Sequence, residues 1–212
     1  MFRVKICGIT NWPDARRAIE AGCDALGFNF YSRSPRCISP QDAAAIRSRL
    51  PHEIAAVGVF VNESPAAIAE LAAAVGLDFA QLHGEERPSA ARSVGRTTPV
   101  IKAFRVGPRF QPARLAPYPA AAYLLDGAKP NGHLRGGTGH TFDWSLARAA
   151  SRYGPIVLAG GLTPDNVAQA IRTAHPAAVD VATGVESAPG HKDARKLRAF
   201  LDAVDSARKD FA

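Results

Sequence analysis

The sequence contains little of what marks secreted, zinc-binding or membrane proteins. Three cysteines, Cys7, Cys23 and Cys37, are an odd number without metal-ligand spacing, which argues against a disulfide framework or structural zinc. No hydrophobic run approaches the roughly 20 residues that a membrane-spanning helix needs, and the first residues lack the pattern of a signal peptide. We therefore expect a protein of the reducing cytoplasm with no membrane partner.

The sequence also lacks a long cluster of charges of one sign. The 212 residues include 26 Lys and Arg against 19 Asp and Glu, a net charge of +7. The densest basic stretch, HKDARKLR at 191–198, is typical of the solvated face of a last helix. Proteins that bind nucleic acid usually cluster arginines with interleaved aromatic residues. That pattern is missing, so we expect no nucleic-acid partner, while the excess positive charge suits an enzyme with an anionic ligand.

Short apolar runs rich in β-formers recur along the whole chain and predict strands. Between them lie segments with helix start signals: Ser39, Ser64 and Thr163 each stand directly before a proline, and Asn11 stands two residues before Pro13. The weakest helical segment is 108–117, which three prolines interrupt. The eight predicted strands are 2–9, 25–30, 54–61, 79–83, 99–106, 121–127, 155–161 and 177–184.

Alternating strands and helices predict a parallel sheet built from βαβ units. Eight such units with no segment left over favour a closed (β/α)₈ barrel formed as a single domain by residues 1–212. An open doubly wound sheet would more often show a Gly-x-Gly-x-x-Gly turn after the first strand, and CGITNW at 7–12 is not that turn. Enzymes with this fold carry their active sites at the carboxyl ends of the strands.

Two reactive side chains lie at those carboxyl ends. Cys7 closes the first strand and Asp126 closes the sixth, so a small molecule above the barrel would have a thiol on one side and a carboxyl on the other. Such a pair could move protons as acid and base. Lys5 shares the face of Cys7, and we expect it to pair with Asp180 on the neighbouring strand, because an unpaired lysine inside a barrel would be costly.

Glycine-rich turns follow the seventh and eighth strands, where this fold often binds phosphate through backbone N–H groups. They contain Gly160 and Gly161 in one turn and Thr183 and Gly184 in the other, which favours a phosphorylated substrate. Past the second strand, the loop 31–39 carries Arg33 and Arg36, and an arginine there could bind a carboxylate at the far end of the ligand. Arg33 is more typical of a solvent-exposed loop charge.

Several motifs together resemble the phosphoribosylanthranilate isomerase family of tryptophan biosynthesis. They are KICGIT, GFNFYSRSPR, QLHG, LLDG, GGTGHTFDW, LAGGLTPDNV and VDVATGVESAPGHKD, which follow in order over nearly the whole chain. The resemblance implies that Cys7 is the general base, that Asp126 is the general acid and that Arg36 contacts the anthranilate carboxylate. It also implies an aldose–ketose isomerase, an intramolecular oxidoreductase, that performs an Amadori rearrangement of an aminosugar phosphate without metal or cofactor, as a monomer or homodimer.

Some positions depart from the family pattern or have no assigned part in the chemistry. Ala182 and Thr183 stand where the family usually has two serines, so one side-chain hydroxyl near the phosphate is lost. His83 is interpreted as a packing residue or a residue that supports the site, and segment 128–141 as a candidate lid or a loose connection. Cys23 and Cys37 are expected to be bystanders. The alternatives are an epimerase-like or indole-glycerol-phosphate synthase-like barrel enzyme, or a non-catalytic basic binding protein.

Overall fold

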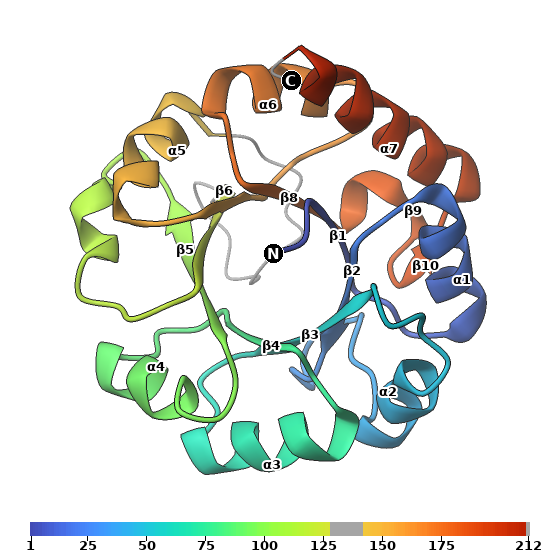
Figure 1. Cartoon of the computed structure of the whole chain (residues 1–212), viewed down its shortest axis with the longest axis vertical. Coiled ribbons are helices and arrows are strands. Elements are labelled where there is room, and N and C mark those ends of the chain that lie inside the picture. The colour runs from blue at the N-terminus through green and yellow to red at the C-terminus, as the bar shows by residue number, and fades with distance from the viewer. Residues whose placement is uncertain (128–141, 211–212) are drawn as a thin grey trace.

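The computed structural model describes residues 1–127 and 142–210, and Figure 1 shows strands that circle a central axis inside a ring of helices. The strands form one closed parallel barrel in chain order, with β8 paired to β1, which confirms the predicted (β/α)₈ fold. The candidate lid at 128–141 lies outside the described residues. The strands are β1 (Val4–Cys7), β2 (Ala25–Asn29), β3 (Ala55–Phe60), β4 (Phe79–Leu82), β5 (Val100–Val106), β6 (Ala122–Gly127), β7 (Ile156–Leu158) and β8 (Ala178–Val181).

The helices that cover the barrel begin largely where their caps predict. The side chains of Asn11, Ser39 and Ser64 each accept a hydrogen bond from a backbone N–H in the first turn of the helix that follows. None of the helices in the described ranges is long and apolar enough to cross a membrane. The helices are α1 (Trp12–Ala21), α2 (Pro40–Arg47), α3 (Pro65–Val75), α4 (Pro88–Val94), α5 (Ser145–Ala150), α6 (Val167–Ala174) and α7 (Ala194–Lys209).

Two predicted helices differ from the sequence-based expectation. Thr163 is not the N-cap of its helix. Residues 164–166 form a turn in which Asn166 Oδ1 accepts a hydrogen bond from the Thr163 N–H, and α6 starts only at Val167. The proline-broken segment 108–117 forms a short 3₁₀ turn, η1 (Pro112–Leu115), instead of an α-helix. Two further 3₁₀ turns are η2 (Ser151–Tyr153) and η3 (Thr183–Val185).

The basic stretch 191–198 is not one helical face, so this prediction was wrong. A small hairpin of β9 (Glu186–Ala188) and β10 (His191–Lys192) precedes α7, which begins only at Ala194. Lys192 is 3% exposed, because the hairpin turns its side chain inward. The charged stretch therefore spans the end of a hairpin and the start of a helix, and the sequence of charges does not show where one ends and the other begins.

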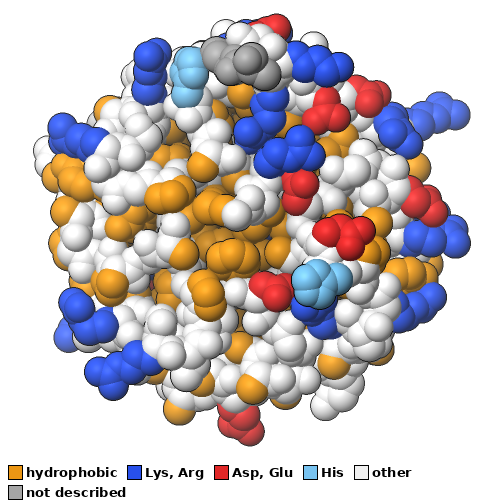
Figure 2. All heavy atoms as spheres, in the orientation of Figure 1, with side chains coloured by type: hydrophobic (Ala, Val, Ile, Leu, Met, Phe, Trp, Pro, Cys, Tyr) orange, Lys and Arg blue, Asp and Glu red, His pale blue; other side chains and the backbone are white. Residues whose placement is uncertain are grey.

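The barrel is filled from its amino end, which leaves its carboxyl end for polar groups. One cluster of hydrophobic side chains contains Phe2 together with residues of alternating positions on the strands, including Val57, Ile101 and Leu124. The N-terminus lies over the centre of the barrel in Figure 1, and Figure 2 shows hydrophobic side chains gathered over the centre of that same face. The other alternating positions face the helices and build the larger outer core.

Candidate active site

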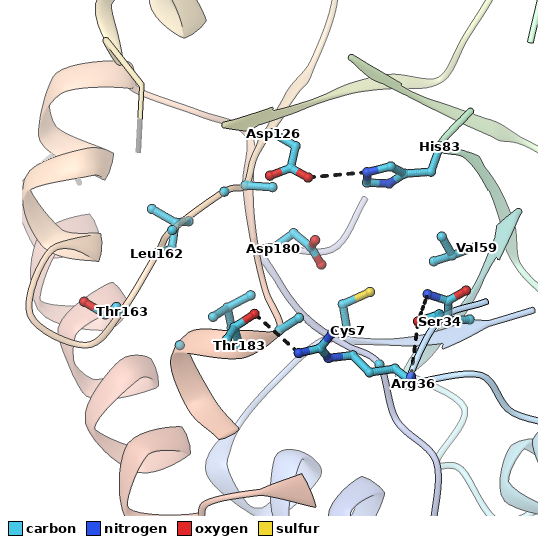
Figure 3. A pocket seen from close by; sticks show the side chains of 18 of the residues that line it. Cys7, Ser34, Arg36, Val59, His83, Asp126, Leu162, Thr163, Asp180 and Thr183 are labelled. Carbon is cyan, nitrogen blue, oxygen red and sulfur yellow. Dashed lines mark hydrogen bonds and ion pairs between the residues drawn. The ribbon is translucent and has the colours of Figure 1, made fainter. Parts of the chain in front are cut away.

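A cavity of about 670 Å³ opens at the carboxyl ends of the strands. Its walls come from β1, β2, β3, β4, β6 and β8, from the loops at the carboxyl ends of the strands, including the loop after β7, and from the start of α7. The carboxyl ends of the strands are where this fold carries its chemistry. Figure 3 shows Cys7 and Asp126 on opposite sides of this cavity, with Asp180 between them. The cavity brings together every site residue that the sequence predicts: Cys7, Arg36, Asp126, Gly160, Gly161, Thr183 and Gly184.

Cys7 and Lys5 project into the barrel from β1 because β2 makes room for them. Cys7 is in register with Gly27, and a Cβ atom at Gly27 would lie 2.8 Å from Cys7 Sγ and 3.0 Å from Lys5 Nζ. Lys5 is fully buried, and its Nζ lies 2.7 Å from Asp180 Oδ1, which confirms the predicted pair. Glycine at position 27 therefore allows a lysine and a thiol to lie side by side beneath the cavity.

The surroundings of Cys7 act on its pKa in opposite directions. Burial raises the pKa of Cys7 above its ordinary value, the positive charge of Lys5 works against this, and Asp180 adds to the rise. Burial alone would lower the pKa of Lys5, but Asp180 and the thiol outweigh it and leave that pKa raised. The raised pKa of Cys7 favours the thiol, and the raised pKa of Lys5 favours a charged ammonium group beside it.

Asp126 faces a histidine from the neighbouring part of the barrel. His83 Nε2 lies 3.4 Å from Asp126 Oδ2, and Gln81 Nε2 lies 2.7 Å from His83 Nδ1. This contact joins Gln81 to Nδ1 of the His83 ring, and the ring presents Nε2 toward the carboxyl group of Asp126. His83 lines the cavity, so it is part of the site as well as a packing residue. The motif QLHG at the end of β4 is the signal that indicates it.

Arg36 reaches the cavity wall from the loop after β2. Its Nε lies 2.8 Å from Glu186 Oε1 and its Nη2 lies 2.6 Å from Glu186 Oε2, a two-pronged ion pair. Nη2 also lies 3.5 Å from Thr183 Oγ1, which links the arginine to the glycine turn after β8. Hydrogen bonding to Glu186 raises the pKa of Arg36, so its charge is permanent.

Glu186 and Lys192 are buried groups of the site that the sequence reasoning missed. Lys192 Nζ lies 2.9 Å from Glu186 Oε1, 2.6 Å from the carbonyl oxygen of Cys7 and 3.4 Å from that of Ala182. The block VESAPGHK holds both residues on the two strands of the β9–β10 hairpin. A glutamate and a lysine on either side of a glycine turn were the available signal, but charge patterns alone do not show which side chains turn inward.

The glycine turns after β7 and β8 form the wall between Asp126 and Cys7. Gly160 has φ +82°, and a Cβ atom there would lie 2.7 Å from Asp126 Oδ1, so a larger residue would collide with the carboxylate. Thr163, Arg195 and Lys196 also line this part of the cavity. A turn without side chains next to basic residues suits an anionic group such as a phosphate.

Other predicted bystanders lie outside this arrangement. Cys23 is buried and Cys37 is exposed, and neither cysteine lines the cavity, nor does Arg33. Burial raises the pKa of Cys23 to about 12, so its thiol is unreactive. Within the described ranges, no three His, Cys, Asp or Glu side chains gather as metal ligands would.

Fold and cavity together define a (β/α)₈-barrel enzyme equipped for acid–base chemistry on an anionic ligand. Residues 4–203 match the family model described as N-(5'phosphoribosyl)anthranilate (PRA) isomerase. A relative of that name from Pelobacter propionicus is 50% identical over 210 residues, which cover 99% of each chain. The chain belongs to the phosphoribosylanthranilate isomerase family, as its motifs predict.

Crystal structures of this family share the architecture. The phosphoribosyl anthranilate isomerase of Thermotoga maritima is 44% identical, with a TM-score of 0.88 over 97% of this chain and 100% of the other. Another structure of such an isomerase, in complex with reduced 1-(o-carboxyphenylamino)-1-deoxyribulose 5-phosphate, is 41% identical. Its TM-score is 0.85 over 97% of this chain and 100% of the other chain. Family and fold thus agree over the length of the barrel.

Proposed function

We propose that this chain isomerises N-(5-phospho-β-D-ribosyl)anthranilate to 1-(2-carboxyphenylamino)-1-deoxy-D-ribulose 5-phosphate, with Asp126 as general acid and Cys7 as general base. The observation that carries these roles is that both side chains face one cavity from opposite walls. This reaction is a step of tryptophan biosynthesis and the activity of the family to which the chain belongs. We assign it to one domain, residues 1–212, working as a monomer or homodimer in the cytoplasm without nucleic acid.

The first step opens the sugar ring. The protonated carboxyl of Asp126 donates its proton to the ring oxygen, the bond between C1 and that oxygen breaks, and an iminium forms between C1 and the anthranilate nitrogen. The negative charge stays on the carboxylate of Asp126, and His83 faces this carboxylate with Nε2 at 3.4 Å from Oδ2. The positive iminium makes the proton on C2 more acidic, which prepares the second step.

The second step removes the proton from C2. The thiolate of Cys7 takes it, the C2–H electron pair forms the C1–C2 double bond, and the iminium nitrogen becomes neutral. The enolamine then gains a proton at C1 and loses one from the C2 hydroxyl, which gives the ketone with no net gain or loss of protons. Burial raises the pKa of Cys7, and the positive charge of Lys5 opposes this and favours the thiolate.

The remaining residues would hold the two anionic ends of the substrate. The glycine turns with Gly160, Gly161, Thr183 and Gly184 are proposed to bind the phosphate, largely through backbone N–H groups because Ala182 lacks a hydroxyl. Arg36, which lies on the Cys7 side of the cavity and contacts Thr183, is proposed to bind the anthranilate carboxylate through the end edge formed by its two Nη atoms. A substrate held at both ends keeps C1 and C2 between the acid and the base.

Turnover of the two variants Cys7→Ala and Asp126→Asn tests these roles. Both should fold and bind the product, yet lose at least about 100-fold in kcat, the usual contribution of a general acid or base. The decay of substrate fluorescence measures turnover, and a product titration measures binding. Cys37→Ala, which removes an exposed thiol outside the cavity, should keep wild-type kcat. Full activity of Cys7→Ala would refute the role of the thiol.

A further inference from the structure

The buried pair of Glu186 and Lys192 has no part in the proton transfers, yet it contacts the backbone of Cys7 and the side chain of Arg36. Glu186 is 5% exposed and Lys192 is 3% exposed, so neither serves the solubility of the surface. The ammonium of Lys192 has three donors, and it lies near three acceptors: Glu186, the carbonyl of Cys7 and the carbonyl of Ala182. One cation therefore connects the strand of the thiol with the loop after β8.

The carboxylate of Glu186 fixes the orientation of the Arg36 guanidinium. A guanidinium offers two edges with paired donors, a side edge of Nε and one Nη, and an end edge of the two Nη atoms. Glu186 occupies the side edge, through Nε at 2.8 Å and Nη2 at 2.6 Å. In residues 1–127 and 142–210, Nη1 has no hydrogen-bond acceptor, and on the end edge Nη2 makes only the long 3.5 Å contact with Thr183 Oγ1. Arg36 also lines the cavity, so this edge can still receive a ligand carboxylate.

We propose that Glu186, held by Lys192, is a positioning residue that presents the end edge of Arg36 to the ligand and so selects arylamines that carry a carboxylate. The inference rests on the proposed role of Arg36. Without Glu186 the long arginine side chain would be free to turn, and a second carboxylate could no longer bind it in a fixed two-pronged geometry. The specificity for anthranilate would then depend on a residue that need not touch it.

The charges at this point also favour a carboxylate over a neutral group. Glu186 supplies one negative charge against the positive charges of Arg36 and Lys192, which leaves one positive charge facing the ligand. Burial lowers the pKa of Lys192 although Glu186 opposes it. Glu186 thus binds two cations, the buried Lys192 and the half-buried Arg36, and a ligand carboxylate completes the neutralisation.

The proposal is tested with two ligands that differ only in the carboxylate. These are reduced 1-(o-carboxyphenylamino)-1-deoxyribulose 5-phosphate and its phenylamino counterpart, and the ratio of their dissociation constants measures selection. We expect Glu186→Gln to reduce this ratio about 10- to 100-fold, the range for a hydrogen bond to a charged group. KM for the substrate should rise by a similar factor while kcat changes less. Calorimetric titration gives the constants.

Glu86→Gln is the matched control, because Glu86 is also a buried glutamate that pairs with a lysine at the barrel mouth. Its carboxylate lies 2.8 Å from Lys102 Nζ and does not contact Arg36. This variant should keep the wild-type ratio. If Glu186→Gln fails to fold, Glu186→Asp serves instead, since its shorter side chain keeps the charge but cannot span both guanidinium nitrogens.

Arg36→Met separates the inference from the proposed function. If Arg36→Met abolishes the selection and Glu186→Gln leaves it within twofold of wild type, the positioning role is wrong and the role of Arg36 stands. If Arg36→Met itself leaves the ratio unchanged, Arg36 does not bind the carboxylate. An equal loss of selection in Glu86→Gln would also overturn the proposal, because it would reflect a general disturbance of the mouth.

Discussion

The two sides of the barrel mouth are built alike in one respect and differently in another. Each side has a buried lysine–glutamate pair, Lys192 with Glu186 beside β1 and Lys102 with Glu86 beside β4, at 2.9 and 2.8 Å. Glu186 also binds the side chain of Arg36. In the described part of the chain, the other partners of Glu86 are the backbone N–H groups of residues 62 and 84. One pair orients a side chain, and the other holds a loop.

The surroundings of Cys7 and Asp126, the two reactive groups, also differ in the charged side chains that they contain. Cys7 lies close to the cations Lys5 and Lys192, whose charges lower the pKa of its thiol against the effect of burial. Asp126 pairs only with His83 among the described residues. A thiol needs nearby positive charge to become a thiolate. Both lysines lie on the side of Cys7, so the barrel places these cations next to the proposed base.

The largest effect should come from removing the cation beneath the thiol. Lys5→Met leaves Asp180 buried without its partner, and we expect the free energy of unfolding to fall by about 3–5 kcal/mol. Urea denaturation measures this. Lys102→Met should cost a similar amount, since it strands Glu86 in the same way, but only Lys5→Met should slow the alkylation of Cys7. A Lys5→Met variant within about 1 kcal/mol of wild type would contradict the stabilising role of the pair.

The sequence was sufficient to predict the barrel fold and the positions of most residues that line the cavity. Strand and helix signals recur at regular intervals, and the end of each strand marks one edge of the barrel, so Cys7 and Asp126 could be placed from the chain alone. The pair of Lys5 and Asp180 followed from the cost of burying an unpaired lysine, and the structure confirms it. These inferences depend on local patterns and on topology.

What the sequence did not show depends on packing. Lys192 was expected on an exposed helix face, because a charged run gives no sign of a two-strand hairpin that turns one lysine inward. Its partner Glu186 was not singled out for the same reason. The proline after Thr163 suggested that α6 starts there, but the helix starts only at Val167, after a turn that contains the hydrogen bond from the Thr163 N–H to Asn166 Oδ1. Side-chain direction in short loops is set by contacts between distant segments.

A smaller effect should follow when the negative charge beside the thiol is removed. Asp180 raises the pKa of Cys7, so Asp180→Asn should lower it and speed alkylation by iodoacetamide at pH 8 by about tenfold for each pKa unit. The experiment uses a Cys37→Ser background, because that thiol is exposed. Cys23, with a pKa of about 12, is the unreactive internal reference. Slower alkylation in Asp180→Asn would contradict this electrostatic account of the base side.

The smallest effect concerns how acid weakens the two lysine–glutamate pairs. Burial alone would raise the pKa of both glutamates, but Lys102 outweighs it at Glu86, and Arg36 with Lys192 outweighs it at Glu186, so both pKa values are lowered. A lowered carboxyl pKa stabilises the fold above the unfolded value near 4.5 and loses this contribution as pH falls through the folded pKa. The stability advantage of wild type over Glu186→Gln and over Glu86→Gln should therefore narrow between pH 6 and pH 3.5, by roughly 1 kcal/mol each. Urea denaturation across this range measures both gaps, and a gap that widened toward low pH would show that the carboxylate is not the form that holds its pair together.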